Sequence, residues 1–430
     1  MRRRCPIVLA LVSTLGAATA CDARRGAAGE DGSPWVTQVD STGDTIRIRI
    51  TGEIPTAQER RLVPEVEIGA EDGAEEETFG SVVTVLPTQD RGFLIFDDQV
   101  PALRLFDSAG TFVKNIGHKG GGPGEFEQVN GITSLPDGRI VVWDATGARL
   151  NTYSDTGAFL ATSRVPSSGQ FGQNVLWSDD QGRSYAWAVL ERDSIDFTRG
   201  TRGVIVFDGD GKVLDSLPYP VWREPPPSLI AKSPDGRISS AYGFPFWPHS
   251  VATVARQGGF VSGPGEPYVL YFTHRQGAKP VRVDRDFTPV PVSATERSEQ
   301  RAMVEFGLRR TDPNWSWTVT DIPADKPAYE ELMVAIDGRV WVKLSTAAVA
   351  IPAGELPAVR SGQEDRPRTT TRTPSVYDVF SPGGRLLGRV AIPRRVTLQT
   401  AVGNDVYAVR RDSLDVQYVV RYRVEPALPR

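Results

Sequence analysis

The sequence predicts an all-β fold, a six-bladed β-propeller built from four-stranded blades. Three observations support this prediction: a repeat with a spacing of 47 residues, six copies of one turn-and-strand pattern, and many turn-forming residues. The chain of 430 residues holds 42 glycines and 33 prolines, and frequent Gly and Pro between short apolar runs are typical of all-β proteins. We expect one departure from this pattern, a short helical insertion between blades 4 and 5.

The repeat is clearest in residues 90–97 and 137–144, which read DRGFLIFD and DGRIVVWD. The offset of 47 residues also aligns Phe112 with Phe159. Each unit reads as a turn, an apolar strand, an Asp, an alternating strand, a polar turn with Gly and a further strand. Asp-Gly turns between such runs are typical of β-hairpins, and a period of about 40 to 50 residues predicts a propeller blade.

Four further segments open with the same pattern, with more drift: 180–183, 257–261, 337–342 and 403–408. Six openings predict six blades of about four strands each. A propeller must also close its ring. We expect the hairpin-like segments 35–39 and 45–50 to add a strand to the last blade, because closure removes two exposed sheet edges.

The N-terminus carries the features of an export signal. Three arginines follow Met1, and an apolar run then extends to Ala20. This order of basic and apolar residues predicts a signal peptide at residues 1–20, and the apolar run is too short for a membrane-spanning helix of about 20 apolar residues.

Residues 18–20 read Ala-Thr-Ala directly before Cys21. They match the A-x-A pattern of a signal-peptidase site and also resemble a bacterial lipobox, although lipoboxes usually carry Leu where Ala18 stands. Cys21 would be the only cysteine of the mature chain, because Cys5 leaves with the leader. We therefore expect lipidation of Cys21, a lipidated flexible tether at 21–34, and a membrane-anchored lipoprotein of the cell envelope. A periplasmic or secreted soluble protein is the alternative.

The expected propeller domain covers residues 35–424, with an insertion at 285–330 and a C-terminal tail at 425–430. Residues 116–126 read IGHKGGGPGEF. This run resembles the inter-blade signature of NHL-type six-bladed propellers, especially those of bacterial lipoproteins. The resemblance implies the fold and an interaction role, but no activity, because one fold hosts many functions.

The glycines of this run could also suggest a phosphate-binding loop. A P-loop needs Gly-Lys-Ser/Thr at the start of a helix, whereas Lys119 here precedes Gly120 and Pro123 follows. We expect a tight link between blades whose glycines take positive φ values.

Candidate metal ligands are few and scattered. The three histidines, at unequal places in the repeat, are His118, His249 and His274. We interpret the repeated Asp97, Asp144 and Asp208 as turn caps. The acidic stretch 65–77 is expected to be a solvated face, and a calcium site is the less favoured alternative. No cofactor is therefore expected. Calcium or zinc is the alternative, as in relatives of this fold with lyase or lactonase activity.

Two departures from the repeat, residues 241–249 and 285–330, are rich in aromatic side chains. The second contains a capping box at Ser293 and Glu296, followed by a predicted helix over 297–309. Loops on a rigid scaffold concentrate binding residues, although plain packing is the alternative for aromatic groups. The candidate ligand-binding residues are Phe244, Phe246, Trp247, His249, Trp315, Trp317 and Tyr329. Residues 352–374 read as a mobile surface loop.

The net charge is −4, and the chain has no basic stripe, so nucleic acid is not an expected partner. No Gly-x-Ser-x-Gly elbow occurs, and we assign no catalytic residue. We expect a monomeric binding or scaffold module of the cell envelope for a peptide, glycan or protein partner. The alternative is a metal-dependent lyase or lactonase with a site on the propeller axis.

Overall fold

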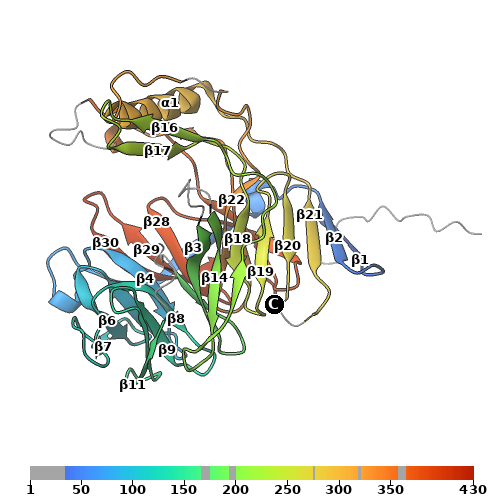
Figure 1. Cartoon of the computed structure of the whole chain (residues 1–430). Helices are drawn as coiled ribbons and strands as arrows, with labels where there is room; N and C mark the ends of the chain where they lie inside the picture. Colours follow the sequence, from blue (N-terminus) through green and yellow to red (C-terminus); the bar gives the residue numbers. More distant parts are fainter. Residues whose placement is uncertain (1–33, 166–174, 193–199, 275–276, 318–320, 357–364) are drawn as a thin grey trace, which may run out of the picture.

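The computed structural model describes residues 34–165, 175–192, 200–274, 277–317, 321–356 and 365–430. These residues form six four-stranded antiparallel blades arranged as a propeller (Figure 1), which confirms the predicted fold class. The first strand of each blade is innermost, because first strands contact those of neighbouring blades. The signal peptide at 1–20, Cys21 and all but the last residue of the tether lie outside the described residues.

Blades 1 to 3 follow one another along the chain, each as a meander of four strands. Blade 1 comprises β4 (Val82–Pro87), β5 (Phe93–Asp97), β6 (Val100–Phe106) and β7 (Phe112–Ile116). Blade 2 comprises β8 (Val129–Ser134), β9 (Ile140–Asp144), β10 (Arg149–Tyr153) and β11 (Phe159–Arg164). Blade 3 comprises β12 (Leu176–Ser178), β13 (Ser184–Arg192), β14 (Gly200–Phe207) and β15 (Val213–Pro218).

Blades 4 to 6 complete the ring, and strands from the N-terminal segment join two of them. Blade 4 comprises β18 (Val251–Val254), β19 (Phe260–Gly263), β20 (Val269–Phe272) and β21 (Val281–Arg285). Blade 5 comprises β22 (Tyr329–Val334), β23 (Val340–Leu344), β26 (Val376–Phe380) and β27 (Leu386–Ala391). Blade 6 comprises β28 (Val396–Val402), β29 (Asp405–Arg411), β30 (Gln417–Glu425) and the N-terminal β3 (Arg60–Ile68).

The second strand of a blade is covered on both faces by neighbouring blades. In β5 and β9 every residue is buried, and their side chains divide between separate hydrophobic clusters on the two sides. A strand buried on both faces needs a continuous apolar run rather than an alternating one. Burial on both faces therefore explains the apolar runs FLIF and VVW of the sequence repeat.

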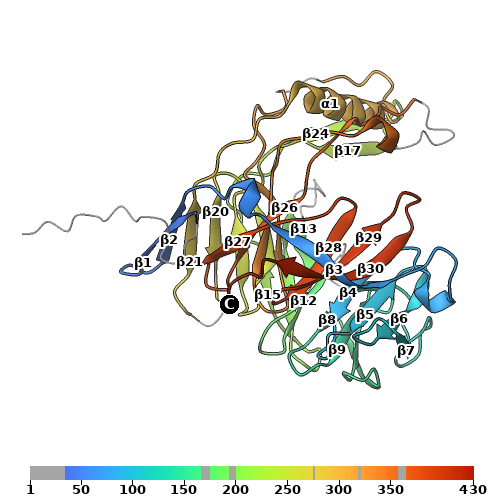
Figure 2. The ribbon, with the colours of Figure 1, turned by 180° about the vertical axis from the view of Figure 1, so that it is seen from behind.

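The ring is closed by a different segment from the one predicted. Strand β3 pairs antiparallel with β30 and parallel with β27, so it completes blade 6 and joins it to blade 5 (blue among red strands in Figure 2). The predicted hairpin forms as β1 (Val36–Asp40) and β2 (Ile46–Thr51), but β2 pairs parallel with β21 at the outer edge of blade 4. The alternating Ile residues of β2 explain this position, because Ile48 and Ile50 are buried in the core between blades 4 and 5.

A separate layer, here called the cap, lies beyond one end of the propeller (Figure 1). Its elements are the hairpin β16 (Ser228–Lys232) and β17 (Ser239–Gly243), the helix α1 (Ala294–Arg309), and the short pair β24 (Val349–Ala350) and β25 (Thr371–Arg372). The insertions that carry these elements precede β18, precede β22 and follow β23. First strands begin, and second strands end, on the same face of a propeller, so all three insertions emerge on one side.

The cap has a small hydrophobic core of its own, in which α1 packs against the hairpin. The predicted capping box is confirmed: Ser293 accepts a hydrogen bond from the Glu296 amide, and the Glu296 side chain accepts one from the Ser293 amide. The sequence interpretation missed the hairpin β16–β17. Within the region predicted as a mobile loop, residues 353–355 form a 3₁₀ turn and Thr371–Arg372 pair as β25, while 357–364 lie outside the described residues. Two further 3₁₀ turns lie at Thr56–Gln58 and Glu75–Glu77.

Among the described residues, no helix has the length and apolar character needed to cross a membrane.

Candidate functional site

A pocket of about 470 Å³ lies where the cap meets blade 5. This volume falls within the range of about 300 to 1,000 Å³ that is usual for ligand sites. Its lining consists of Pro226, Gly243, Phe244, Phe246, Trp247, His249, Pro327 and Glu330. Four of these are predicted ligand-binding residues, all from the aromatic loop that follows β17.

Phe244 anchors this loop to the cap. Its side chain is only 5% exposed, and its ring contacts Trp247 and Trp317 edge-on at centroid distances of 5.3 and 5.6 Å. Trp247 and Phe246 are half-buried and lie at the edge of the cap core. The aromatic side chains therefore serve two purposes, since the same cluster fills the cap and lines the pocket.

The other three predicted residues do not line the pocket. Trp315 and Trp317 pack against the cap core, where the Trp315 indole nitrogen donates to the Ile230 carbonyl at 3.0 Å. Tyr329 is fully buried between blades 4 and 5, and its hydroxyl donates to the Val269 carbonyl at 2.8 Å.

Phe246 has an unusual backbone conformation, with φ at +56°. A bulky residue in the left-handed region is an outlier that the surrounding structure must enforce. The buried ammonium of Lys326 lies 5.3 Å from the centroid of the Phe246 ring, so a cation–π contact helps to fix the ring. Lys326 is itself held by the Glu296 carboxylate and by the Thr346 carbonyl.

Glu330 contributes the only carboxylate to the pocket lining. It sits at an irregularity in the pairing of β22 with β23, between Tyr329 and Glu331, and bulges of this kind redirect side chains. The Lys343 ammonium lies 3.8 Å from each of the Glu330 and Glu331 carboxylates. One lysine thus faces two carboxylates, so these three side chains together carry one negative charge.

The sequence interpretation missed Glu330 and Pro226. Blades 1 and 2 have the same irregularity at the start of their first strands, where the intervening residues are Val83 and Asn130. These two residues are separated by the repeat offset. Extending the repeat to blade 5 would have singled out Glu330 as a charged residue at a position that is otherwise neutral.

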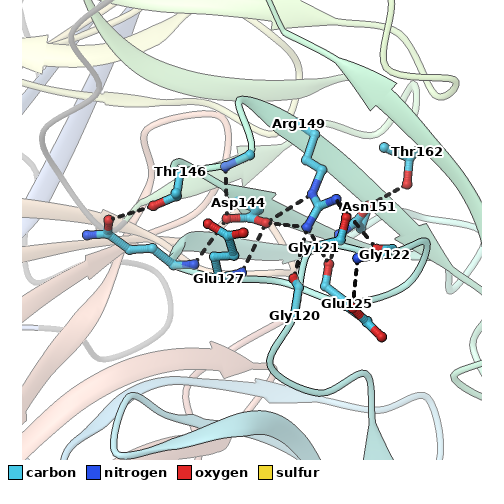
Figure 3. Close-up of polar contacts among 12 residues, drawn as sticks. Gly120, Gly121, Gly122, Glu125, Glu127, Asp144, Thr146, Arg149, Asn151 and Thr162 are labelled. Atoms are coloured by element: carbon cyan, nitrogen blue, oxygen red, sulfur yellow. Dashed lines mark hydrogen bonds and ion pairs between the residues drawn. The ribbon is translucent and has the colours of Figure 1, made fainter.

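The glycine-rich run is a structural link, as predicted. Gly117 and Gly124 adopt φ values of +66° and +74°. The guanidinium of Arg149 donates to the carbonyls of Gly120, Gly121, Gly122 and Glu125 and pairs with Asp144 at 2.9 Å (Figure 3). The carbonyls of the run therefore face a cation, whereas a phosphate cradle would present its amides.

The repeated aspartates bond to backbone amides, and the predicted turn cap describes Asp208 best. Asp97 accepts hydrogen bonds from the Gly80 and Ser81 amides, and Asp144 accepts them from the Glu127 and Gln128 amides. Asp208 accepts from two amides within its own turn. Asp97 and Asp144 thus tie separate backbone segments together, whereas Asp208 caps its own turn.

The acidic stretch is only partly the solvated face that was expected. Glu65 and Glu67 belong to β3, where Glu65 pairs with Arg91 and Arg423, and Glu67 pairs with Arg410. These carboxylates therefore help to hold the ring-closing strand.

The histidines occupy separate places. The His118 Nε2 lies 3.0 Å from a Glu125 carboxylate oxygen, His249 lines the pocket, and His274 follows β20. No group of three or more His, Cys, Asp or Glu side chains that could hold a metal ion occurs in the described part of the chain.

Comparison with known proteins agrees with the fold. Residues 74–212 match the model of a family described as a 6-bladed beta-propeller (DUF5128). No curated protein matches the chain.

Solved structures of similar fold include a protein of Bacteroides fragilis described as exported, at 12% identity and a TM-score of 0.45, covering 88% of this chain and 99% of that one. A member of the DUF4221 family from Bacteroides vulgatus has 12% identity and a TM-score of 0.49, covering 86% of this chain and 99% of that one. A gluconolactonase from Xanthomonas campestris has 12% identity and a TM-score of 0.34, covering 86% and 97%. Such distant likenesses carry no information on function.

Proposed function

We propose that the protein is an exported binding module of the cell envelope, held to a membrane by lipid on Cys21, and that the pocket between the cap and blade 5 receives its partner. Export is supported by the basic and apolar residues before Cys21. A lipid-anchored propeller is also suggested by the resemblance of residues 116–126 to the NHL-type lipoprotein signature.

The observation that carries the proposed site is the composition of the pocket. Three aromatic residues, two prolines and one glycine line it beside a single carboxylate and an imidazole. Apolar pockets with a few placed polar groups are typical of binding sites. The strained backbone of Phe246 supports the same conclusion, because strain of this kind concentrates at functional sites.

The location of the pocket also favours binding. Its residues come from the insertions and from the entry into blade 5, rather than from the repeated parts of the blades. The blades pack against one another without the aromatic loop after β17, whose side chains pack the cap and also line the pocket. Binding residues are commonly placed on such loops of a rigid scaffold.

The test fills the pocket without disturbing the fold. Gly243 lines the pocket, and a Cβ added there would meet no atom within 4 Å, so Gly243→Leu should fold normally. Gly354 has the same free space but lies away from the pocket, and Gly354→Leu is the matched control. Both variants are compared with the wild type by cross-linking to a detergent extract of the organism's cell envelope, followed by mass spectrometry.

We expect a partner that the wild type and Gly354→Leu capture equally, with capture by Gly243→Leu reduced about tenfold. Equal capture by all three proteins would remove the pocket from the proposed function.

A further inference from the structure

We propose that the pocket recognises a peptide segment in which an apolar ring, of proline or an aromatic residue, lies close to a Lys or Arg. This inference rests on the proposed function and names the ligand of the same site. The ring would enter between the aromatic and proline side chains, and the basic group would pair with Glu330.

The walls of the pocket favour an apolar ring over a cation. Phe246 already has the Lys326 ammonium 5.3 Å from its ring centroid. An aromatic ring attracts a cation through its electron-rich face, and a ring that is already polarised by one ammonium attracts a second cation poorly. Pro226, Pro327 and Trp247 complete an apolar surface of the kind that receives proline-rich or aromatic segments.

The same lining disfavours a sugar. The hydroxyl groups of a buried sugar each need a hydrogen-bond partner, because an unpaired polar group costs about 1 to 3 kcal/mol. The pocket lining supplies only two side chains that form strong hydrogen bonds, Glu330 and His249; the Trp247 indole adds one donor. A peptide can instead bury one side chain and leave its polar backbone in water.

The charge at the rim selects the neighbouring residue of the ligand. Glu330 and Glu331 share the single ammonium of Lys343, at 3.8 Å from each. The Glu330 carboxylate accepts one further hydrogen bond, from the Ser345 hydroxyl at 3.3 Å. The remaining negative charge attracts a basic side chain and repels an acidic one.

The chain provides a matched pair of charge variants. Glu330→Gln removes the carboxylate in the pocket and keeps its shape. Glu331→Gln removes a carboxylate that touches the same lysine but does not line the pocket. A purely electrostatic effect of the shared charge would change both variants alike, whereas direct contact with the ligand would make Glu330→Gln weaken binding more than Glu331→Gln.

The probe is a phage-displayed random dodecapeptide library, selected on the wild-type protein and counter-selected on Gly243→Leu. Selected peptides are then synthesised with fluorescein, and their Kd values are measured by fluorescence anisotropy at several salt concentrations. We expect enrichment of Pro, Phe, Tyr or Trp within three residues of Lys or Arg. Glu330→Gln should weaken binding about fivefold and reduce its salt dependence, while Glu331→Gln, which keeps the carboxylate in the pocket, should weaken binding less, by about twofold.

Other outcomes would overturn the inference. Pocket-dependent peptides without a basic residue, or peptides insensitive to Glu330→Gln, would reject the basic component. Glycan-array binding that Gly243→Leu abolishes, without peptide binding, would replace the peptide with a sugar while the proposed function survives. If Gly243→Leu changes neither library selection nor capture from the envelope, both proposals fail.

Discussion

Arg149 shows how a single side chain determines the conformation of the glycine-rich run. Its guanidinium is nearly buried and bonds to four backbone carbonyls and to the fully buried Asp144 (Figure 3). Glycine is needed where the backbone takes positive φ, as at Gly117 and Gly124. The sequence revealed the glycines, but the guanidinium that organises them lies more than twenty residues further along the chain.

Replacing Arg149 with Met should lower the free energy of unfolding by about 3 kcal/mol, because a buried carboxylate would lose its charged partner. Arg164→Met, at an exposed position in the same blade, is the control and should change stability by less than about 0.5 kcal/mol. Urea denaturation followed by tryptophan fluorescence measures both. Equal stability of the two variants would show that Arg149 is dispensable for the link.

At the scale of elements, a buried charge cluster joins blade 4, blade 5 and the N-terminal segment. Asp378 of β26 accepts hydrogen bonds from Arg285 at 2.7 Å and from Arg389 at 2.8 Å, while Arg285 also donates to the Gly52 carbonyl. Burial alone would raise the pKa of Asp378, but the two guanidinium groups outweigh burial and hold this pKa below its usual value. Arg285 ends β21, so the cluster fixes the edge to which β2 is attached.

The lowered pKa of Asp378 has a consequence for stability against acid. A carboxyl group with a depressed folded pKa contributes stability above its unfolded pKa of about 3.9 and loses it as the pH falls further. Asp378→Asn should therefore lower the free energy of unfolding at pH 7 by about 3 to 5 kcal/mol, which is measured as a lower urea midpoint. Its stability should also fall less than that of the wild type between about pH 4 and pH 2.

Two comparisons isolate this effect. Asp284→Asn removes a half-exposed partner of Arg282 and should shift the midpoint only slightly. Burial raises the pKa of the nearby Glu59, so protonation of Glu59 stabilises the folded state as the pH falls. This gain opposes the loss of stability from Asp378. Measurements in a Glu59→Gln background remove it. Parallel pH profiles for wild type and Asp378→Asn would contradict the assignment.

For the whole molecule, the proposed lipid anchor raises the question of where the tether would join the propeller. The described chain begins at the outer edge of blade 4, where β1 and β2 extend that blade away from the axis (Figure 1). The cap instead arises from insertions before β18 and β22 and after β23. A lipid anchor on Cys21 would thus attach at the rim of the propeller.

Lipidation predicts a shift between cell fractions. Cys21→Ser should move the protein from the membrane fraction to the soluble fraction and abolish incorporation of labelled palmitate, because stable anchoring depends on the acyl chains. Cys5→Ser, which alters only the predicted leader, is the control and should leave both unchanged. A wild-type protein that carries no label and stays soluble would favour the secreted alternative.

Much of the fold could be predicted because the blade pattern is local. Strands buried on both faces require continuous apolar runs, and Asp-Gly turns between them recur at the repeat offset, so six openings implied six blades. The helix α1 could also be predicted, because its capping box depends on two residues only three positions apart, Ser293 and Glu296. The hairpin β16–β17 was missed because its strand residues are largely exposed. Its strands therefore lack the continuous apolar runs that mark the buried strands of the blades.

The sequence alone determined the blade count, the helix and the aromatic loop, because each depends on neighbours along the chain. Only the tertiary structure decided which strand closes the ring, since the choice between β2 and β3 depends on which distant sheet edge each apolar face fits. It also decided which aromatic residues share a pocket. Phe244, Phe246, Trp247 and His249 meet Glu330 only because the cap folds back onto blade 5, whereas Tyr329, adjacent to Glu330 in the chain, points into the core.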